Sequence, residues 1–186
     1  MKTPIFQAID ALASRHANGD ELPKIDLVGD GVAGDLLAAT IKRVRSQLVN
    51  DTDLAGRSLA RRLSQQADSW FESLAGSLPA GWALMATGGY AGGVLCPGSD
   101  IDVVLLHPNK ASDAQVREVA ESLWYPLWDG GIKLSPAVHT TKTLLALGSD
   151  DLESATTILR VRCLAGDPEL VARLQADALE QWRRKP

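Results

Sequence analysis

Two short, almost wholly apolar segments in the middle of the chain, residues 82–87 and 101–106, flank a stretch that is rich in glycine. Each segment has the length and the buried character of a central strand, and turn residues separate the two. Residues 132–138 form a third strand candidate, in which Pro136 indicates a sheet edge or a bulge. A small sheet is therefore expected in the second half of the chain.

Helices are expected on both sides of these strands in the sequence. Apolar spacing and capping patterns predict helices over residues 3–16, 31–48, 54–77, 112–127, 140–147 and 149–164, with a last one after Asp167 and Pro168. The order of elements predicts an α/β or α+β domain. The pattern changes near residue 80, so we expect a helical N-terminal region, 1–79, and a core with C-terminal helices, 80–186, within one compact unit.

Composition excludes several classes of protein. The 186 residues, 45% of them hydrophobic, suffice for one domain with a real core. No apolar run reaches the roughly 18 residues of a membrane span, and no secretory leader is recognisable. Two cysteines, Cys96 and Cys163, make no disulfide framework, and a net charge of −4 disfavours DNA or RNA binding through a basic surface. We expect a cytoplasmic protein without nucleic-acid or membrane partners.

Two carboxylates stand at the start of the second strand candidate. Asp100 and Asp102 are two residues apart, so on a strand their side chains point to the same face, about 6–7 Å apart. Such charges repel unless a cation lies between them, and carboxylate oxygens suit Mg²⁺, which also binds phosphate. Both are candidate catalytic residues and ligands of Mg²⁺ or Mn²⁺. The alternative is that one caps a turn and the other is a solvated strand start.

The glycine-rich stretch supplies candidate phosphate ligands. Gly88 and Gly89 end the first strand candidate, and glycine lets a backbone come close to a phosphate, although glycines also end many ordinary strands. Tyr90 is a candidate ligand contact, and Ser99 can either bind phosphate or cap its turn. Arg162 can reach a triphosphate, or pair with Glu153 or Asp167; the sequence leaves these alternatives open.

The order of strand, Gly-Gly turn, ten-residue spacer and Asp-Ile-Asp resembles the nucleotidyltransferase superfamily that shares its catalytic fold with DNA polymerase β. Within it, the chain is most similar to the N-terminal domain of bacterial PII uridylyltransferase/uridylyl-removing enzymes. The resemblance covers about residues 55–175, and its motifs are residues 88–90, 95–106, 123–131, 138–140 and 159–168.

This resemblance implies a small mixed sheet with an N-terminal helical leader and C-terminal helices. It also implies Mg²⁺-dependent transfer of a uridylyl group from UTP to a tyrosine of a PII-type signal protein, in nitrogen regulation. Asp100 and Asp102 would then hold the metal, and Gly88, Gly89 and Ser99 the β- and γ-phosphates. Tyr90 and Arg162 would be further nucleotide contacts.

The chain departs from the family pattern at three places. Gly92 and Val94 stand where the family usually has Arg and Glu, and Arg160 stands near a position that is often acidic. The superfamily usually has a third carboxylate on a neighbouring strand, and residues 132–140 contain none. Two alternatives therefore remain: a catalytically impaired regulatory or protein-interaction domain of the same fold, or a stand-alone transferase of another nucleotide.

Overall fold

A four-stranded mixed sheet forms the centre of the molecule. The structure is a computed structural model that describes residues 31–76 and 78–184, so the helix predicted over residues 3–16 lies outside the described residues. The strands are β1 (Ala83–Ala86), β2 (Ile101–Leu106), β3 (Leu134–His139) and β4 (Arg162–Gly166), in the order β3-β2-β1-β4. β1 is antiparallel to β2 and β4, whereas β2 and β3 are parallel. The predicted α/β class with a small mixed sheet is confirmed.

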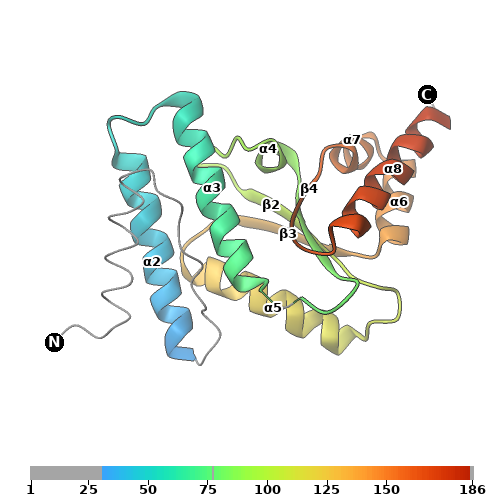
Figure 1. Cartoon of the computed structure of the whole chain (residues 1–186), viewed down its shortest axis with the longest axis horizontal. Helices are drawn as coiled ribbons and strands as arrows, with labels where there is room; N and C mark the ends of the chain where they lie inside the picture. Colours follow the sequence, from blue (N-terminus) through green and yellow to red (C-terminus); the bar gives the residue numbers. More distant parts are fainter. Residues whose placement is uncertain (1–30, 77, 185–186) are drawn as a thin grey trace.

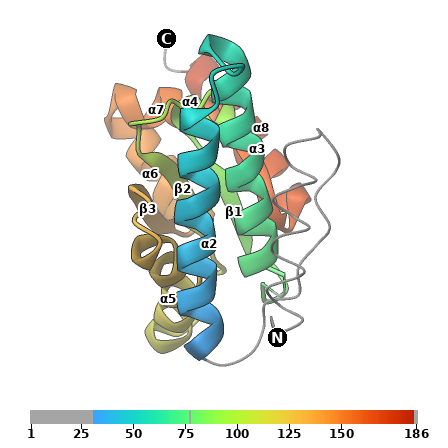
Figure 2. The ribbon, with the colours of Figure 1, turned by 90° about the vertical axis from the view of Figure 1, so that its left-hand side faces the viewer.

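Helices cover both faces of this sheet (Figure 1). They are α2 (Gly31–Asn50), α3 (Gly56–Leu74), α4 (Gly88–Ala91), α5 (Asp113–Asp129), α6 (Thr141–Asp150), α7 (Leu152–Leu159) and α8 (Pro168–Arg184). Figure 2 shows α2 and α3 side by side. Ser112 caps α5 by accepting a hydrogen bond from the Gln115 backbone, as the sequence predicts.

Alternate residues of the central strands enter two separate cores. Leu84, Val103 and Leu105 pack with α2, α3 and α5 on one face, while Met85 and Val104 pack with α6, α7 and α8 on the other. Both faces of β1 and β2 are thus covered. This explains why the sequence of these strands is continuously apolar rather than alternating.

One strand was not predicted. The sequence indicates a helix over 149–164, but α7 ends at Leu159 and the next residues form β4, paired with β1. Residues 160–165 continue the preceding apolar pattern without a turn residue, so only the free edge of β1 makes this segment a strand. The third strand candidate is confirmed as β3, and it lies at an edge of the sheet, as Pro136 predicts.

The N-terminal helices hold the loop that precedes β2. Arg45 Nη2 of α2 donates a hydrogen bond of 2.7 Å to the Pro97 carbonyl. The buried Ser64 hydroxyl of α3 accepts one of 3.0 Å from the Leu95 backbone N–H. The division of the chain at residue 80 stays a prediction. In the described ranges, no helix combines the length and the apolar character needed to cross a membrane.

Candidate functional site

Asp102 and Gly88 are in close contact at the end of the sheet where β1 ends and β2 begins. Asp102 is the second residue of β2 and is half-buried, and Gly88 follows β1. A Cβ atom at Gly88 would lie 2.9 Å from Asp102 Oδ2, and Gly88 has φ +56°. Both the close approach and the left-handed backbone require glycine. Gly89, the other predicted phosphate ligand, does not have a positive φ.

A cleft of about 460 Å³ opens beside this contact. Because Asp102 lies on the face of β2 toward α6 and α7, these two helices form the opposite wall. The polar lining residues are Thr87, Gly88, Asp102, Ser135, His139, Asp151, Glu153, Ser154 and Thr157. The lining thus includes three carboxylates and no lysine or arginine among the described residues.

The surroundings of Asp102 disfavour its charged form. Burial and the neighbouring charge of Asp100 raise the pKa of Asp102, and a hydrogen bond with Ser135 partly opposes that shift. Asp100 is exposed immediately before β2. Burial, and then the charge of His107, lower the pKa of His139, so this imidazole does not supply a compensating positive charge at neutral pH. The structure brings Asp102 and Gly88 together, whereas Asp100 acts on Asp102 through its charge and is not among the residues that line the cleft.

Tyr90 of α4 and Arg162 of β4 meet at a different place, against Asp68 of α3. The Tyr90 ring is buried, and its hydroxyl donates a 2.6 Å hydrogen bond to Asp68 of α3. Arg162 forms a two-pronged ion pair with the same carboxylate, at 2.9 and 3.0 Å, and its guanidinium lies over the Tyr90 ring. Burial and the Asp68 charge raise the pKa of Tyr90, so the phenol stays protonated.

The proposed pairing of Arg162 with Glu153 or Asp167 is therefore wrong, because Asp68 is its partner. Arg162 also lies on a strand rather than on the predicted helix. No observation tests nucleotide binding by Tyr90 or Arg162, which stays a prediction. Ser99 closes a turn by donating a 3.0 Å hydrogen bond to the Cys96 carbonyl, and its predicted phosphate contact is likewise untested.

Sequence reasoning missed three residues that the fold brings to these groups. Ser135 of β3 is in register with Asp102, because β2 and β3 are parallel. Glu153 reaches the cleft from the first turn of α7, and Asp68 reaches Tyr90 from α3. None of the three belongs to a local motif. Only the pairing of β2 and β3, which the order strand–helix–strand suggests, could have indicated Ser135.

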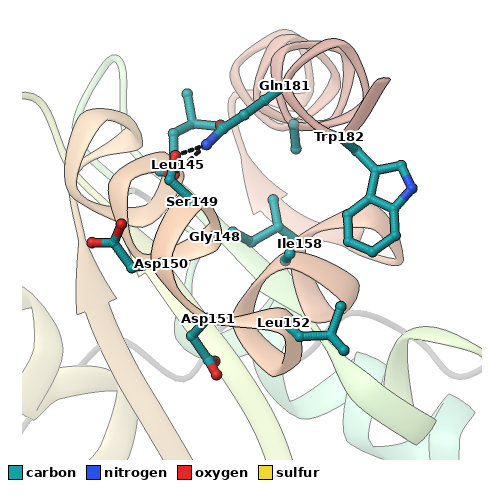
Figure 3. Close-up of a pocket in the computed structure, with 11 residues that line it drawn as sticks. Leu145, Gly148, Ser149, Asp150, Asp151, Leu152, Ile158, Gln181 and Trp182 are labelled. Carbon is teal, nitrogen blue, oxygen red and sulfur yellow. Dashed lines mark hydrogen bonds between the residues drawn. The ribbon is translucent and has the colours of Figure 1, made fainter. Parts of the chain in front are cut away.

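A second cavity, of about 210 Å³, lies among α6, α7 and α8 (Figure 3). Gln181 of α8 crosses it to donate hydrogen bonds to the Leu145 carbonyl, at 3.1 Å, and to the Ser149 hydroxyl. Trp182 closes one side and is 40% exposed. None of the predicted site residues lines this cavity, but Asp151 and Ile158 line both it and the cleft beside Asp102, so the two cavities adjoin each other.

Several known proteins that are similar in sequence are named uridylyltransferase/uridylyl-removing enzymes. A bifunctional uridylyltransferase/uridylyl-removing enzyme of Streptomyces coelicolor is 36% identical over 76% of this chain, and one of Corynebacterium glutamicum is 39% identical over 67%. An enzyme of the same name from Bradyrhizobium sp. strain BTAi1 is 32% identical over 93%. The resemblance found in the sequence is confirmed.

The similarity covers only one part of these relatives. The chain spans between 17% and 20% of their length. No protein-family model matches the chain. Among solved structures, a toxin–antitoxin complex with AMP-PNP aligns with 63% of this chain and 87% of its own, at 13% identity and a TM-score of 0.40.

Proposed function

We propose that this chain is a Mg²⁺-dependent nucleotidyltransferase that transfers the uridylyl group of UTP to a tyrosine of a PII-type signal protein. The observation that supports it most is the contact of Asp102 with Gly88 at the mouth of a polar cleft. The similarity to uridylyltransferase/uridylyl-removing enzymes supports the choice of a uridylyl group as the group transferred.

The residues around Asp102 fit a divalent cation. Asp100 and Asp102 offer carboxylate oxygens and Ser135 a hydroxyl, which are the hard ligands that Mg²⁺ prefers. Burial and the charge of Asp100 raise the pKa of Asp102, and a cation beside this carboxyl group would favour its ionised form. When bound, Mg²⁺ or Mn²⁺ would neutralise charge on the phosphates of the nucleotide.

The proposed reaction is an in-line displacement at the α-phosphorus of UTP. The bond from the tyrosine oxygen to phosphorus forms, the bond to the β-phosphate bridging oxygen breaks, pyrophosphate leaves, and the phenolic proton passes to solvent. The contribution of this chain is positioning: Gly88, Gly89 and Ser99 would hold the β- and γ-phosphates against the carboxylates. The polar cleft beside Asp102 leaves room for the reacting groups.

Ser135 favours a second candidate function. It occupies the position of β3 in register with Asp102, so the neighbouring strand supplies a hydroxyl rather than a third carboxylate. A domain with this site could bind a nucleotide, and thereby regulate or recruit a partner, without transferring the uridylyl group.

Calorimetric titration with UTP, ATP, GTP and CTP, each with Mg²⁺ and with a chelator, tests the proposal. We expect UTP-selective binding that needs the metal and that Asp102→Asn abolishes. Asp177→Asn on the exposed side of α8 is the matched control and should bind UTP as the parent does. Failure of all four nucleotides to bind at millimolar concentration would contradict the proposal.

A further inference from the structure

The guanidinium of Arg160 packs directly against Gly92. A Cβ atom built on Gly92 would lie 2.8 Å from Arg160 Cζ and 3.4 Å from Nε, and closer still to Nη2. Arg160 follows α7, and Gly92 follows α4. These two short helices lie at the same end of the sheet (Figure 1). The segments after α4 and after α7, which are far apart in the sequence, therefore contact each other through the Arg160 side chain and the Gly92 backbone.

The backbone does not explain why position 92 is glycine. Gly92 has φ −80° and ψ 2°, which any residue can adopt. The lack of a side chain is instead what allows the Arg160 guanidinium to occupy this place. Glycine at position 92 thus makes room for the Arg160 side chain, and the sequence alone does not indicate this contact.

The Arg160 guanidinium lies against the residue that follows α4, and the first residue of α4, Gly88, lines the cleft. Thr157 lines the cleft, and the Arg160 backbone N–H donates to its carbonyl at 3.2 Å. Gly92 is four residues beyond Gly88, about 6 Å along a helix axis. In residues 31–76 and 78–184 no carboxylate pairs with the exposed Arg160 side chain. Arg162, by contrast, is paired with Asp68.

Because the cleft is lined by carboxylates, the positive charge of the Arg160 guanidinium matters for binding an anionic ligand. The described lining residues of the cleft include three carboxylates and neither a lysine nor an arginine. A nucleoside triphosphate in such a cleft needs positive charge in addition to a metal ion. An arginine fork can donate two charge-assisted hydrogen bonds to phosphate oxygens.

We propose that Arg160 binds the β- and γ-phosphates of the nucleoside triphosphate from the rim formed by α4 and α7, and that Gly92 is glycine to admit it. This inference rests on the proposed function and adds a phosphate-binding residue to it. It also separates the two arginines of this segment: Arg160 contacts the ligand, and Arg162 holds the Tyr90–Asp68 network.

Titration of the full chain with UTP and Mg²⁺ tests this assignment. Arg160→Gln should weaken UTP binding about tenfold or more, because charge-assisted hydrogen bonds to phosphate are lost. Arg160→Lys keeps the positive charge but loses the planar guanidinium, so its affinity for UTP should lie between the affinities of the parent and of Arg160→Gln. Arg117→Gln removes an exposed arginine of α5 and should leave the affinity unchanged. The melting temperatures should stay equal, because Arg160 has an exposed side chain.

The Gly92→Ala variant tests the role of the Arg160 guanidinium without changing Arg160 itself. Its Cβ displaces the guanidinium while the backbone remains unstrained, so it should also weaken UTP binding. Adding Gly92→Ala to Arg160→Gln should cause no further loss, because both changes remove one interaction.

The outcomes separate this inference from the proposed function. Equal UTP affinity of the parent and Arg160→Gln, or additive losses in the double variant, would overturn the role of Arg160 and leave the proposed function standing. An equal loss in Arg160→Lys and Arg160→Gln, with lowered melting temperatures, would assign Arg160 to packing alone. If the parent does not bind UTP, the proposed function falls, and the inference falls with it.

Discussion

Asp102 carries a charge that costs the folded protein stability. Its pKa is raised in the folded state, so the unfolded chain ionises more readily and the free energy of unfolding falls as pH rises through this range. A cation at this carboxyl group reverses the effect, because it favours the ionised form. Ionised Asp102 therefore lowers the free energy of unfolding of the unliganded protein, and it should raise that free energy when metal and nucleotide are bound.

Asp102→Asn should raise the melting temperature at pH 7 in the presence of a chelator. The advantage should disappear toward about pH 3, where the carboxyl group is protonated in both the folded and the unfolded parent. With Mg²⁺ and UTP the order should reverse, because only the parent gains stability from the ligand. Thermal scans across pH measure both effects. A variant less stable than the parent at pH 7 without metal would contradict this account of Asp102.

Tyr90 is the second residue whose surroundings predict an effect. Its hydroxyl is buried and donates to the Asp68 carboxylate, so Tyr90→Phe should lower the free energy of unfolding by about 1–3 kcal/mol. Tyr125→Phe is the matched control, because Tyr125 is 50% exposed, and it should change stability by less than about 0.5 kcal/mol. Denaturant unfolding measures both variants. Equal stabilities of the two variants would refute a structural role for the Tyr90 hydroxyl.

At the scale of elements, the turn between β1 and α4 couples backbone geometry to the site. Gly88 and Gly93 both have positive φ, but only a Cβ at Gly88 would meet Asp102, since nothing lies within 4 Å of one at Gly93. Comparing alanine variants of Gly88 and Gly93 therefore distinguishes the destabilisation caused by backbone strain from the effect on the Asp102 carboxylate.

Gly88→Ala and Gly93→Ala should both lose about 1–2 kcal/mol of stability through strain. Gly88→Ala should in addition lose the stabilisation by Mg²⁺ and UTP, because its methyl group displaces the Asp102 carboxylate. Gly93→Ala should keep that response. Ligand-dependent melting temperatures of the two variants test this difference, and an equal response in both would show that Gly88 is only a turn residue.

Which elements could be predicted depends on whether their signal is local. The bounds of β2 follow from an apolar run, and the cap of α5 follows from Ser112 and from Gln115 three residues later in the chain. β4 could not be found in this way, because residues 162–166 become a strand by pairing with β1, nearly eighty residues earlier. Tertiary pairing overrode the local pattern there.

In the whole molecule, too, contacts between residues close in sequence could be predicted, whereas contacts that depend on tertiary packing could not. Asp102 and Gly88 could be assigned to one site because the glycine turn and the start of the strand lie within fifteen residues of each other. Ser135, Glu153 and Arg160 come from segments that meet the site only after the sheet and its covering helices have formed. Likewise, the pairing of Arg162 with Asp68 depends on α3 packing across the sheet. These contacts could not be read from spacing.

Transfer of labelled uridylyl from UTP to a PII-type protein, with Mg²⁺, tests the proposed function most directly. We expect label on a tyrosine of the acceptor, and no label when that tyrosine is replaced by phenylalanine. The combined change Asp100→Asn and Asp102→Asn should reduce the rate by at least about a hundredfold, whereas Asp177→Asn should leave it unchanged. A parent chain that binds UTP with Mg²⁺ but transfers no label to the acceptor would contradict the proposed transfer and favour a nucleotide-binding domain without transferase activity.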